Sequence, residues 1–306
     1  MNAKRTTAHV VAAVDGSLGS RGAVAYAARE ARDRGLPLEL VTVVPAYVPA
    51  GPFPMSPEAT MRVAGREVLQ GAFDVATADS PGLEVSTTLL AGSRVDALVR
   101  HTRDAALLVA GAPPHGLAER LWTGSIVTGV AARASCPFVI VPAAGRDVPR
   151  FGRIIVGLKS TNHAEHLLGA AFAVARQTQS DLVVTHAWHM LSGYDDAIAE
   201  RTVDAAWVTE QTRMIEDNLI DLRMTYPDVQ VDVELVHAQP AYALVTQSTN
   251  ADLLLISRPP HGGFVHYLGS TARAVIRDAA CPIEVVPPLS ETLHADHQYH
   301  EVALLP

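Results

Sequence analysis

The sequence predicts an α/β protein built from two tandem doubly wound domains, each an open five-stranded, mostly parallel sheet with helices on both faces. Three observations predict this fold class. The chain has 306 residues, which is more than the roughly 100–200 residues usual for one domain. Its second half repeats its first half. Within each half, apolar runs suited to buried strands alternate with amphipathic helical patterns, and that alternation gives right-handed crossovers and a parallel sheet.

The repeat is carried by two pairs of matching segments. Residues 134–142 (ASCPFVIVP) match residues 279–287 (AACPIEVVP), and residues 106–116 (ALLVAGAPPHG) match residues 252–262 (DLLLISRPPHG). A period this long exceeds that of solenoid repeats and indicates a domain duplication. The predicted organisation is therefore a first domain over 1–142, a linker over 143–152, a second domain over 153–288 and a tail over 289–306.

The first domain opens with an apolar strand over residues 10–14, which the turn residues Asp15-Gly16-Ser17 close. Buried-face alanines then predict an amphipathic helix over 20–34 that ends at Gly35. A second apolar run predicts a strand over 38–44. The remaining elements, in chain order after the proline-rich loop 45–57, are a helix to Asp79, a strand over 83–90, a helix over 94–102, a strand over 106–110, a helix over 125–134 and a strand over 138–141. The second domain repeats this pattern from Arg153 to about Pro288.

Composition and charge exclude several classes of protein. Apolar residues make up 48% of the chain and charged residues 18%, which excludes a disordered chain. The formal net charge is −8 without a cluster of Lys or Arg, so we expect no nucleic-acid partner. No apolar run approaches the roughly 20 residues needed to cross a bilayer, and the N-terminus lacks the apolar core of a signal peptide. We therefore expect a soluble cytoplasmic protein with no membrane partner.

No metal site is predicted. The chain has only two cysteines, Cys136 and Cys281, too few for a disulfide framework or a zinc site. Three histidines of the tail, His294, His297 and His300, have a spacing that could bind zinc or nickel adventitiously. A solvated terminus is the more frequent explanation of such a cluster.

The segments expected at the carboxyl ends of the strands are where ligands bind in an open parallel sheet. They are Asp15-Gly16-Ser17, the stretch after Val43, and the loop from Gly111 to Ser125. Gly124-Ser125 begins a predicted helix, whose free backbone N–H groups and positive dipole end suit a phosphate. An ordinary turn and helix cap would also explain Asp-Gly-Ser and Gly-Ser, so both interpretations stay open.

These segments, together with residues 136–142, resemble the universal stress protein family, and the resemblance covers nearly the whole chain as a tandem pair. Family members that bind ATP carry Gly-x2-Gly-x9-Gly-Ser/Thr after the fourth strand and an Asp after the first. The resemblance implies that Asp15 holds the adenosine, that Val43 contacts the base through its backbone, and that the glycine loop lies along the phosphates. The candidate nucleotide-binding residues are Asp15, Val43, Gly111, His115, Gly116, Gly124, Ser125 and Ile126.

Departures from the family motif are few in the first domain and many in the second. Pro114 replaces the second glycine and Val127 the second hydroxyl residue, so we expect a weaker hold on phosphate than in members with the full motif. The replacements in the second domain are Lys159 for the Asp, Ser257 and Pro260 for the first two glycines, and Ala272 for the second hydroxyl. We expect ATP to bind in the first domain only.

Two functions are compatible with this pattern. The first is a stress-response regulator that binds ATP, or a related adenine nucleotide, without a committed reaction. The alternative is an interaction or structural member of the family that has lost nucleotide binding in both domains. Motifs of other nucleotide and hydrolase folds are absent, so we do not predict an enzyme, with a weak ATPase as the residual case. The resemblance further implies an intrachain pseudo-dimer through residues 138–141 and 283–286, and the sequence leaves a homodimer open.

Overall fold

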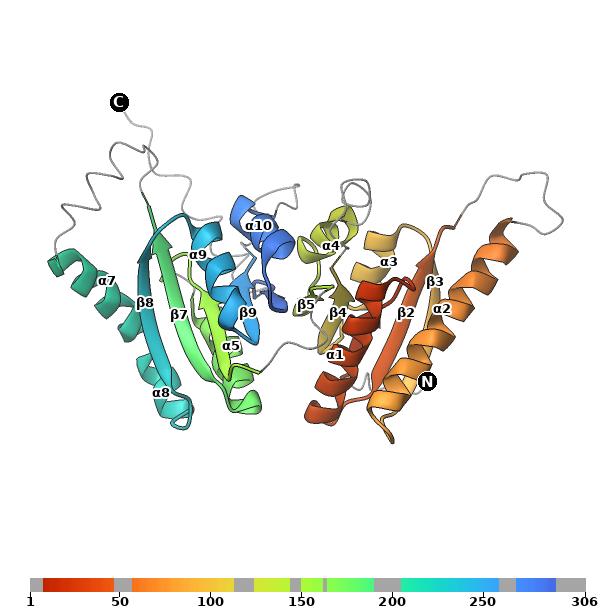
Figure 1. Ribbon diagram of the computed structural model, residues 1–306, viewed down its shortest axis with the longest axis horizontal. Helices are drawn as coiled ribbons and strands as arrows, with labels where there is room; N and C mark the ends of the chain where they lie inside the picture. Colours follow the sequence, from red (N-terminus) through yellow and green to blue (C-terminus); the bar gives the residue numbers. More distant parts are fainter. Residues whose placement is uncertain are drawn as a thin grey trace, which may run out of the picture. The chain divides into compact units, whose positions relative to one another are not determined.

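The computed structural model describes residues 8–46, 57–112, 124–143, 150–161, 164–189, 205–258 and 268–289. Contacts divide the chain into two compact units, unit 1 over Met1–Val148 and unit 2 over Pro149–Pro306. Each unit contains a parallel five-stranded sheet with helices on both faces, as Figure 1 shows. The predicted α/β fold class is confirmed. The predicted contact between the last strands of the two units stays a prediction.

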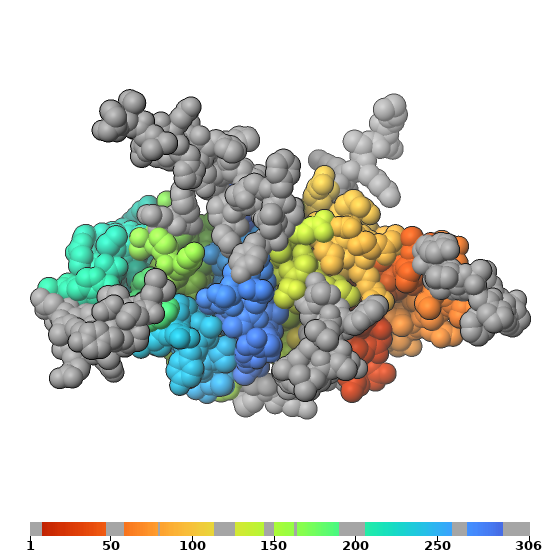
Figure 2. All heavy atoms as spheres, turned by 90° about the horizontal axis from the view of Figure 1, so that it is seen from above, coloured from red at the N-terminus to blue at the C-terminus, as the bar shows by residue number. Residues whose placement is uncertain are grey.

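Unit 1 is a regular alternation of strands and helices. In chain order its elements are β1 (Val10–Ala13), α1 (Leu18–Arg34), β2 (Leu38–Val44), α2 (Pro57–Asp79), β3 (Val85–Ala91), α3 (Arg94–His101), β4 (Leu107–Gly111), α4 (Gly124–Ala131) and β5 (Phe138–Val141). The strand order is β3-β2-β1-β4-β5, with every described pair parallel. Helices α1 and α2 pack on each other over one face, and α3 and α4 lie side by side on the other, gold and yellow in Figure 2.

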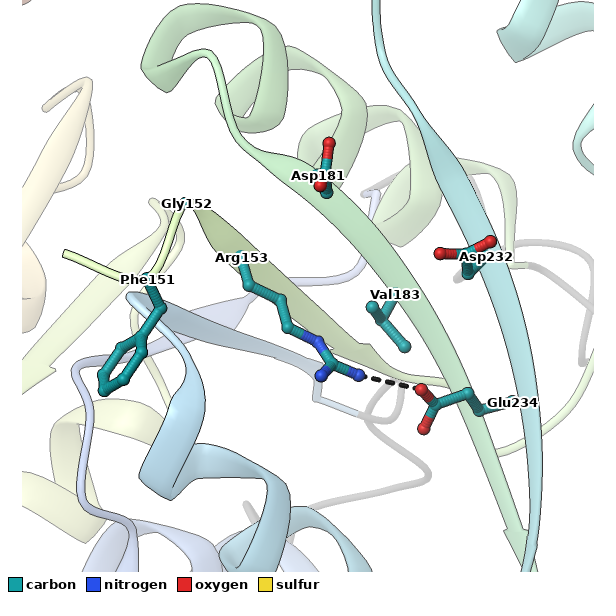
Figure 3. Close-up of a pocket in the computed structure, with 7 residues that line it drawn as sticks. All are labelled: Phe151, Gly152, Arg153, Asp181, Val183, Asp232 and Glu234. Carbon is teal, nitrogen blue, oxygen red and sulfur yellow. Dashed lines mark hydrogen bonds and ion pairs between the residues drawn. The ribbon is translucent and has the colours of Figure 1, made fainter.

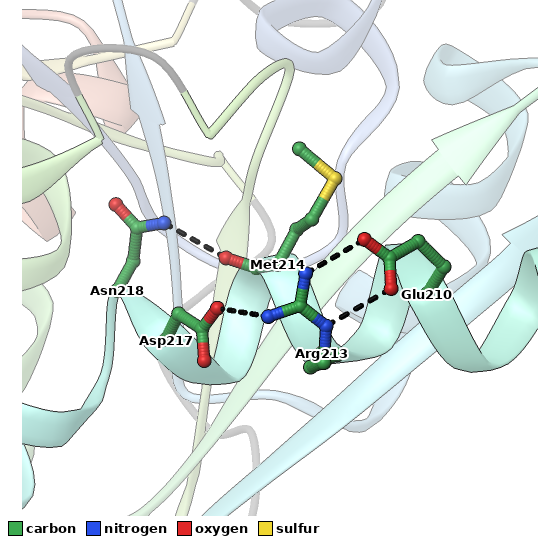
Figure 4. A network of polar contacts seen from close by, with 5 residues as sticks. All are labelled: Glu210, Arg213, Met214, Asp217 and Asn218. Carbon is green, nitrogen blue, oxygen red and sulfur yellow. Dashed lines mark hydrogen bonds and ion pairs between the residues drawn. The ribbon is translucent and has the colours of Figure 1, made fainter.

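Unit 2 has the same order of strands, β10-β9-β6-β7-β8. Its elements are β6 (Arg153–Gly157), α5 (Glu165–Thr178), β7 (Asp181–Trp188), α7 (Ala205–Asp217), α8 (Ile220–Thr225), β8 (Val231–His237), α9 (Pro240–Gln247), a 3-10 turn (Ser248–Asn250), β9 (Leu253–Ser257), α10 (Ser270–Asp278) and β10 (Ile283–Val286). Two helices, α7 and α8, stand where unit 1 has the single helix α2. Where α7 ends, the side-chain amide of Asn218 donates to the carbonyl of Met214 at 2.8 Å (Figure 4).

The core of unit 1 follows from the alanine pattern of α1. Ala23, Ala27, Ala28 and Ala31 are fully buried against alternate residues of β1, β2 and β4. Their small side chains let the helix lie close to the sheet. As predicted, Gly35 ends the helix, and its φ of 64° is a left-handed conformation that glycine adopts without strain. In unit 2 the corresponding layer of α5 is bulkier and includes a fully buried Phe172.

The outer surface of α7 carries charge. Arg213 pairs with Glu210 and with Asp217, each at 2.7 Å, along one side of the helix (Figure 4). The hydrogen bond from Arg213 lowers the pKa of Glu210. Solvent-exposed ion pairs of this kind add little to the free energy of unfolding. They show that this side of α7 faces solvent. Among the described residues, no helix has the length and apolar character needed to span a membrane.

Several predicted boundaries are wrong by one to three residues. Helix α1 begins at Leu18 instead of residue 20, β3 ends at Ala91 instead of residue 90, α3 ends at His101 instead of residue 102, and β4 covers Leu107–Gly111 instead of 106–110. Strand β1 ends at Ala13 instead of residue 14, because the next carbonyl accepts a threonine hydroxyl from β2. Strand β3 begins at Val85 instead of residue 83, because the Leu83 N–H bonds back to Ser80 in a turn through Gly82, whose φ is 86°. Helix α4 covers Gly124–Ala131 instead of 125–134, because after Ala131 the chain leaves the helical pattern in a turn.

Candidate functional site

Asp15 lies at the carboxyl end of β1 in a turn that its own side chain organises. Its Oδ1 accepts the N–H of Ser17 at 2.9 Å, and the Ser17 hydroxyl in turn accepts the N–H of Ser20, capping α1. Gly16, between them, has a φ of 82° and lies against Val68 of α2, so both the backbone and the packing require glycine there. The Asp15 carboxylate is exposed, and its Oδ2 has no partner among the described residues.

Val43 lies on β2 beyond the point where β1 has ended. The register pairs Ala13 with Val41, and the Val14 N–H donates to the Val41 carbonyl at 2.8 Å. Peptide groups two residues apart on a strand point to the same side, so the carbonyl of Val43 also faces the β1 side. No strand residue of β1 is paired with it there. The structure therefore places the backbone of Val43 and the turn of Asp15 at one edge of the sheet.

Gly111 ends β4 in close contact with the first turn of α1. A Cβ at this position would lie 2.5 Å from both the carbonyl carbon and the carbonyl oxygen of Gly19. A Cβ at Gly19 would in turn lie 2.7 Å from the carbonyl oxygen of Ala112. The two glycines thus let β4 and α1 touch through their backbones. Gly111 has a packing role that needs no ligand, which the sequence motif did not reveal.

The remaining predicted residues belong to the loop after β4 and the start of α4. His115 and Gly116 lie outside the described residues. The backbone of α4 begins at Gly124, and Ile126 in its first turn is half-buried. The side chain of Ser125 is also outside the described part of the structure. Asp15, Val43 and Gly111 are therefore brought to one edge, while the role of the loop stays a prediction.

Unit 2 reproduces the backbone of this edge with a different side chain. Asp15 follows the last residue of β1 by two positions, and Lys159 follows the last residue of β6, Gly157, by two positions. As at Val14, the N–H of Leu158 donates to the neighbouring strand at 2.8 Å, here to Thr185. Lys159 is exposed. A carboxylate in unit 1 thus corresponds to an ammonium in unit 2, on the same backbone scaffold.

Bulky groups occupy the rest of the edge in unit 2. Trp188 at the end of β7 stacks on His237 of β8, with ring centroids 4.1 Å apart, and meets Trp207 of α7 edge-on at 4.8 Å. At the end of β9, Ser257 replaces the glycine and is followed by the buried Arg258, whose pKa is lowered by burial.

A pocket of unit 2 lies at the other edge of the sheet, at the amino ends of β6, β7 and β8. Figure 3 shows its lining, Phe151, Gly152, Arg153, Asp181, Val183, Asp232 and Glu234. Ligands of open parallel sheets bind at the opposite, carboxyl edge, and the lining is rich in carboxylates. We therefore do not assign this pocket to a nucleotide.

The described residues contain no group of three or more His, Cys, Asp or Glu side chains that could hold a metal ion. The tail with His294, His297 and His300 lies outside that part of the chain. Cys136 and Cys281 are both free and buried. Burial raises the pKa of both thiols, that of Cys281 to about 12.

A match to a family model identifies the protein family of this chain. The model of the universal stress protein family matches residues 6–142 and again residues 150–287. The chain belongs to the universal stress protein family. Its two copies coincide with unit 1 and unit 2, and the resemblance expected from the motifs is confirmed.

Curated relatives match this chain over nearly their whole length. Universal stress protein Rv2005c of Mycobacterium tuberculosis is 28% identical over 296 residues, which cover 93% of this chain and 99% of that protein. A second universal stress protein of M. tuberculosis, Rv1996, is also 28% identical, over 311 residues that cover 93% of this chain and 96% of the relative.

Solved structures agree with the fold. A universal stress protein from Archaeoglobus fulgidus matches 92% of this chain and 99% of its own, at a TM-score of 0.65 and 18% identity. Shorter universal stress proteins match one unit at a time. One of them was solved in complex with cAMP (26% identity, 44% of this chain and 97% of that chain, TM-score 0.36) and one from A. fulgidus with dAMP (25%, 44% and 96%, 0.35).

Proposed function

We propose that this universal stress protein is a stress-response regulator that binds an adenine nucleotide, ATP or a relative of it, at the carboxyl edge of unit 1. The observation that carries the proposal is the Asp15 carboxylate. It is exposed beside the backbone of Val43, and one of its oxygens has no partner among the described residues. A carboxylate oxygen accepts the hydrogen bonds that ribose hydroxyls donate, and a peptide edge can pair with a base.

The phosphates belong at the start of α4. A helix leaves its first backbone N–H groups without intrahelical acceptors, and its dipole favours negative charge there. Helix α4 follows β4, the strand next to β1 in the sheet. Its first turn, which begins at Gly124, is therefore at the same edge as Asp15. Because Pro114 lacks the N–H of the family's second glycine, we expect weaker binding of phosphate than in family members with the full motif.

Unit 2 is proposed not to bind the nucleotide. The ammonium of Lys159 has only donors, so it cannot accept from ribose hydroxyls as Asp15 can. Trp188 and His237 stack on each other where unit 1 has the small side chains Val44 and Ala91. Both differences act against adenosine.

The proposal includes binding without a committed reaction. Incubation of the protein with ATP is expected to return ATP unchanged over many hours, measured by chromatography of the nucleotide. Steady release of ADP that the Asp15→Asn variant loses would overturn this part and leave the binding proposal intact.

A second candidate is an interaction protein that has lost nucleotide in both units. The observation that favours it is that two motif residues have structural roles of their own. Asp15 Oδ1 holds the Ser17 N–H, and Gly111 gives room for the backbone of Gly19. Retention of these residues is therefore explained without a ligand.

Asp15→Asn separates the two candidates, because asparagine keeps the acceptor for the Ser17 N–H and removes only the charge. Isothermal titration with ATP is expected to show one site in the wild type and a loss of at least about tenfold in affinity in Asp15→Asn, in line with hydrogen bonds to charged groups. Asp33→Asn, an exposed control on α1, should bind like the wild type. Absence of heat with the wild type would favour the second candidate, whereas equal affinity of Asp15→Asn would overturn the role proposed for the Asp15 carboxylate.

A further inference from the structure

In unit 1 the partly buried carboxylate of Glu39 contacts two histidines. Glu39 of β2 accepts the hydroxyl of Thr88 on one oxygen, at 2.5 Å. Its other oxygen lies 3.0 Å from Nε2 of His101 and 3.3 Å from Nε2 of His9. We call Glu39, Thr88, His9 and His101 the Glu39 cluster. The side chains of Glu39, His9 and His101 are 16%, 20% and 27% exposed. His101 is the last residue of α3, so the cluster attaches the end of that helix to the sheet.

Unit 2 has a polar cluster at the same place in the fold, although its carboxylate comes from the third strand, since the register makes Glu39 equivalent to Val183. Strand register pairs Val10 with Leu38 in unit 1 and Ile154 with Leu182 in unit 2. His9, the residue before β1, and Arg153, the first residue of β6, are therefore equivalent.

The other members correspond in the same way. Thr88 is paired with Val41, and Glu234 is paired with Thr185. Val41 and Thr185 are themselves equivalent, since each carbonyl accepts the N–H that follows the first strand. Helices α3 and α9 are both eight residues long, and they end at His101 and Gln247.

The chemistry of the two clusters differs at the positive partner. In unit 2, Arg153 pairs with Glu234 at 2.8 Å, as Figure 3 shows. The Gln247 amide donates to the same carboxylate at 2.6 Å, and its oxygen accepts the Thr185 hydroxyl at 2.7 Å. Arginine stays charged at every physiological pH, while histidine is the side chain that changes charge between about pH 5 and about pH 8. The end of α9 is thus held by the neutral amide of Gln247 on a carboxylate that is paired with an arginine. The end of α3 is held by an imidazole, whose charge depends on pH.

We propose that the Glu39 cluster is a pH-sensitive clamp. Acidification from about pH 8 to about pH 5.5 adds a positive charge to an imidazole beside Glu39 and tightens the attachment of α3 to the sheet of unit 1. The positive partner in unit 2 is an arginine, which stays charged over that range, so we expect α9 not to respond. A protonated His101 in the last turn of α3 also has a favourable interaction with the helix dipole.

Other charges on the surrounding elements do not produce this response. On α3, Asp96 is paired with Arg133 of α4 at 2.6 Å, and this hydrogen bond lowers the pKa of Asp96, so that it stays ionised over the range of the test. The other charged side chains on α3 and on the segments that flank α3 and β3 are exposed to solvent, namely Glu84, Arg94, Arg100, Arg103 and Asp104. Solvent screens them, and they bear little on the clamp.

Hydrogen exchange of the full-length protein tests the clamp with an internal control. Protection factors, that is, exchange rates relative to unstructured peptide at the same pH, are measured for peptides of α3 and α9 at about pH 8 and about pH 5.5. We expect the protection of the α3 end to rise roughly three- to tenfold on acidification, the effect of one partly buried charged contact. Protection of α9 should stay the same within about twofold.

Two sets of variants keep the test decisive. Glu39→Gln retains the shape and the acceptor for Thr88 but leaves two imidazoles facing each other, so the pH response should reverse and α3 should loosen in acid. The double variant His9→Gln and His101→Gln, which places at 101 the residue that unit 2 has at 247, should lose the response. An equal change of α3 and α9 in the wild type, or an unaltered response in Glu39→Gln, would overturn the proposal.

Discussion

Units 1 and 2 share one backbone and differ in the charges placed on it. After the first strand of each, the N–H donates to the next strand at 2.8 Å, yet the exposed side chain that follows is Asp15 in one and Lys159 in the other. The carbonyl at this point also accepts a side chain of the second strand in both, the hydroxyl of Thr42 at 2.7 Å and a ring nitrogen of His186 at 2.9 Å. The two units therefore share the backbone hydrogen bond and satisfy the neighbouring carbonyl with different side chains.

The same comparison limits what a retained motif residue proves. Asp15 and Gly111 both satisfy structural needs of unit 1, so their presence is compatible with either candidate function. What distinguishes unit 1 is the second oxygen of Asp15, which the structure does not use among the described residues. Variants that keep structural roles and remove chemical ones are therefore the informative ones.

The largest expected effect concerns the glycine contact. In Gly111→Ala the new methyl group would meet the backbone of Gly19 at 2.5 Å, which cannot move aside as a side chain would. We expect a loss of about 2–3 kcal/mol in the free energy of unfolding of unit 1, measured by urea unfolding with hydrogen exchange to assign the unit. At the equivalent site of unit 2, Ser257→Ala should change stability by less than about 0.5 kcal/mol. Equal effects of the two changes would contradict the assigned contact.

The next effect concerns the hydroxyl that joins β2 to the end of β1. Thr42 is buried and donates to the Val14 carbonyl at 2.7 Å. Thr42→Val keeps the shape and removes the donor, so we expect unit 1 to lose about 1–2 kcal/mol of unfolding free energy. Thr87→Val, at an exposed position of β3, is the control and should be neutral. A neutral Thr42→Val would show that the carbonyl finds another partner.

The smallest difference is expected at the cysteines, where the units should agree. Burial favours the neutral thiol in the folded state and raises the pKa of Cys136 and of Cys281, the latter to about 12. Alkylation needs the thiolate, so iodoacetamide at about pH 8 should leave both unmodified in native protein and modify both in urea. Above about pH 8.5 the unfolded thiols lose protons that the folded ones retain, so stability should fall as pH rises. Rapid labelling of only one cysteine in the native protein, detected by mass spectrometry, would contradict the expectation that the two units behave alike.

Elements bounded by strong local signals were predictable from the sequence. Strands 38–44 and 138–141 are short apolar runs preceded by proline, and both bounds are confirmed. The stop of α1 at Gly35 follows from glycine's freedom at positive φ. Boundaries that depend on particular hydrogen bonds outside the element itself were not predictable. The end of β1 is set by Thr42, which is distant in sequence, and the start of β3 by a local hydrogen bond to Ser80.

The candidate site was predictable only as far as strand order determines it. The family motif and the parallel sheet together place Asp15, Val43 and Gly111 at one edge, and the structure agrees. The contact of Gly111 with Gly19 and the Glu39 cluster were not predictable. They join residues far apart in sequence, and no spacing rule encodes them. Aligning the two halves could have signalled the second of these, because polar residues recur at the positions of His9 and His101.

The most direct test is to measure how many ATP molecules one chain binds and which unit binds them. Native mass spectrometry at millimolar ATP is expected to show one nucleotide per chain. Hydrogen exchange should then show protection in peptides that contain Asp15 and residues 38–46 of unit 1, and none in peptides that contain Lys159 and residues 181–189 of unit 2. Two nucleotides per chain, protection in unit 2, or no bound nucleotide at all would contradict the account.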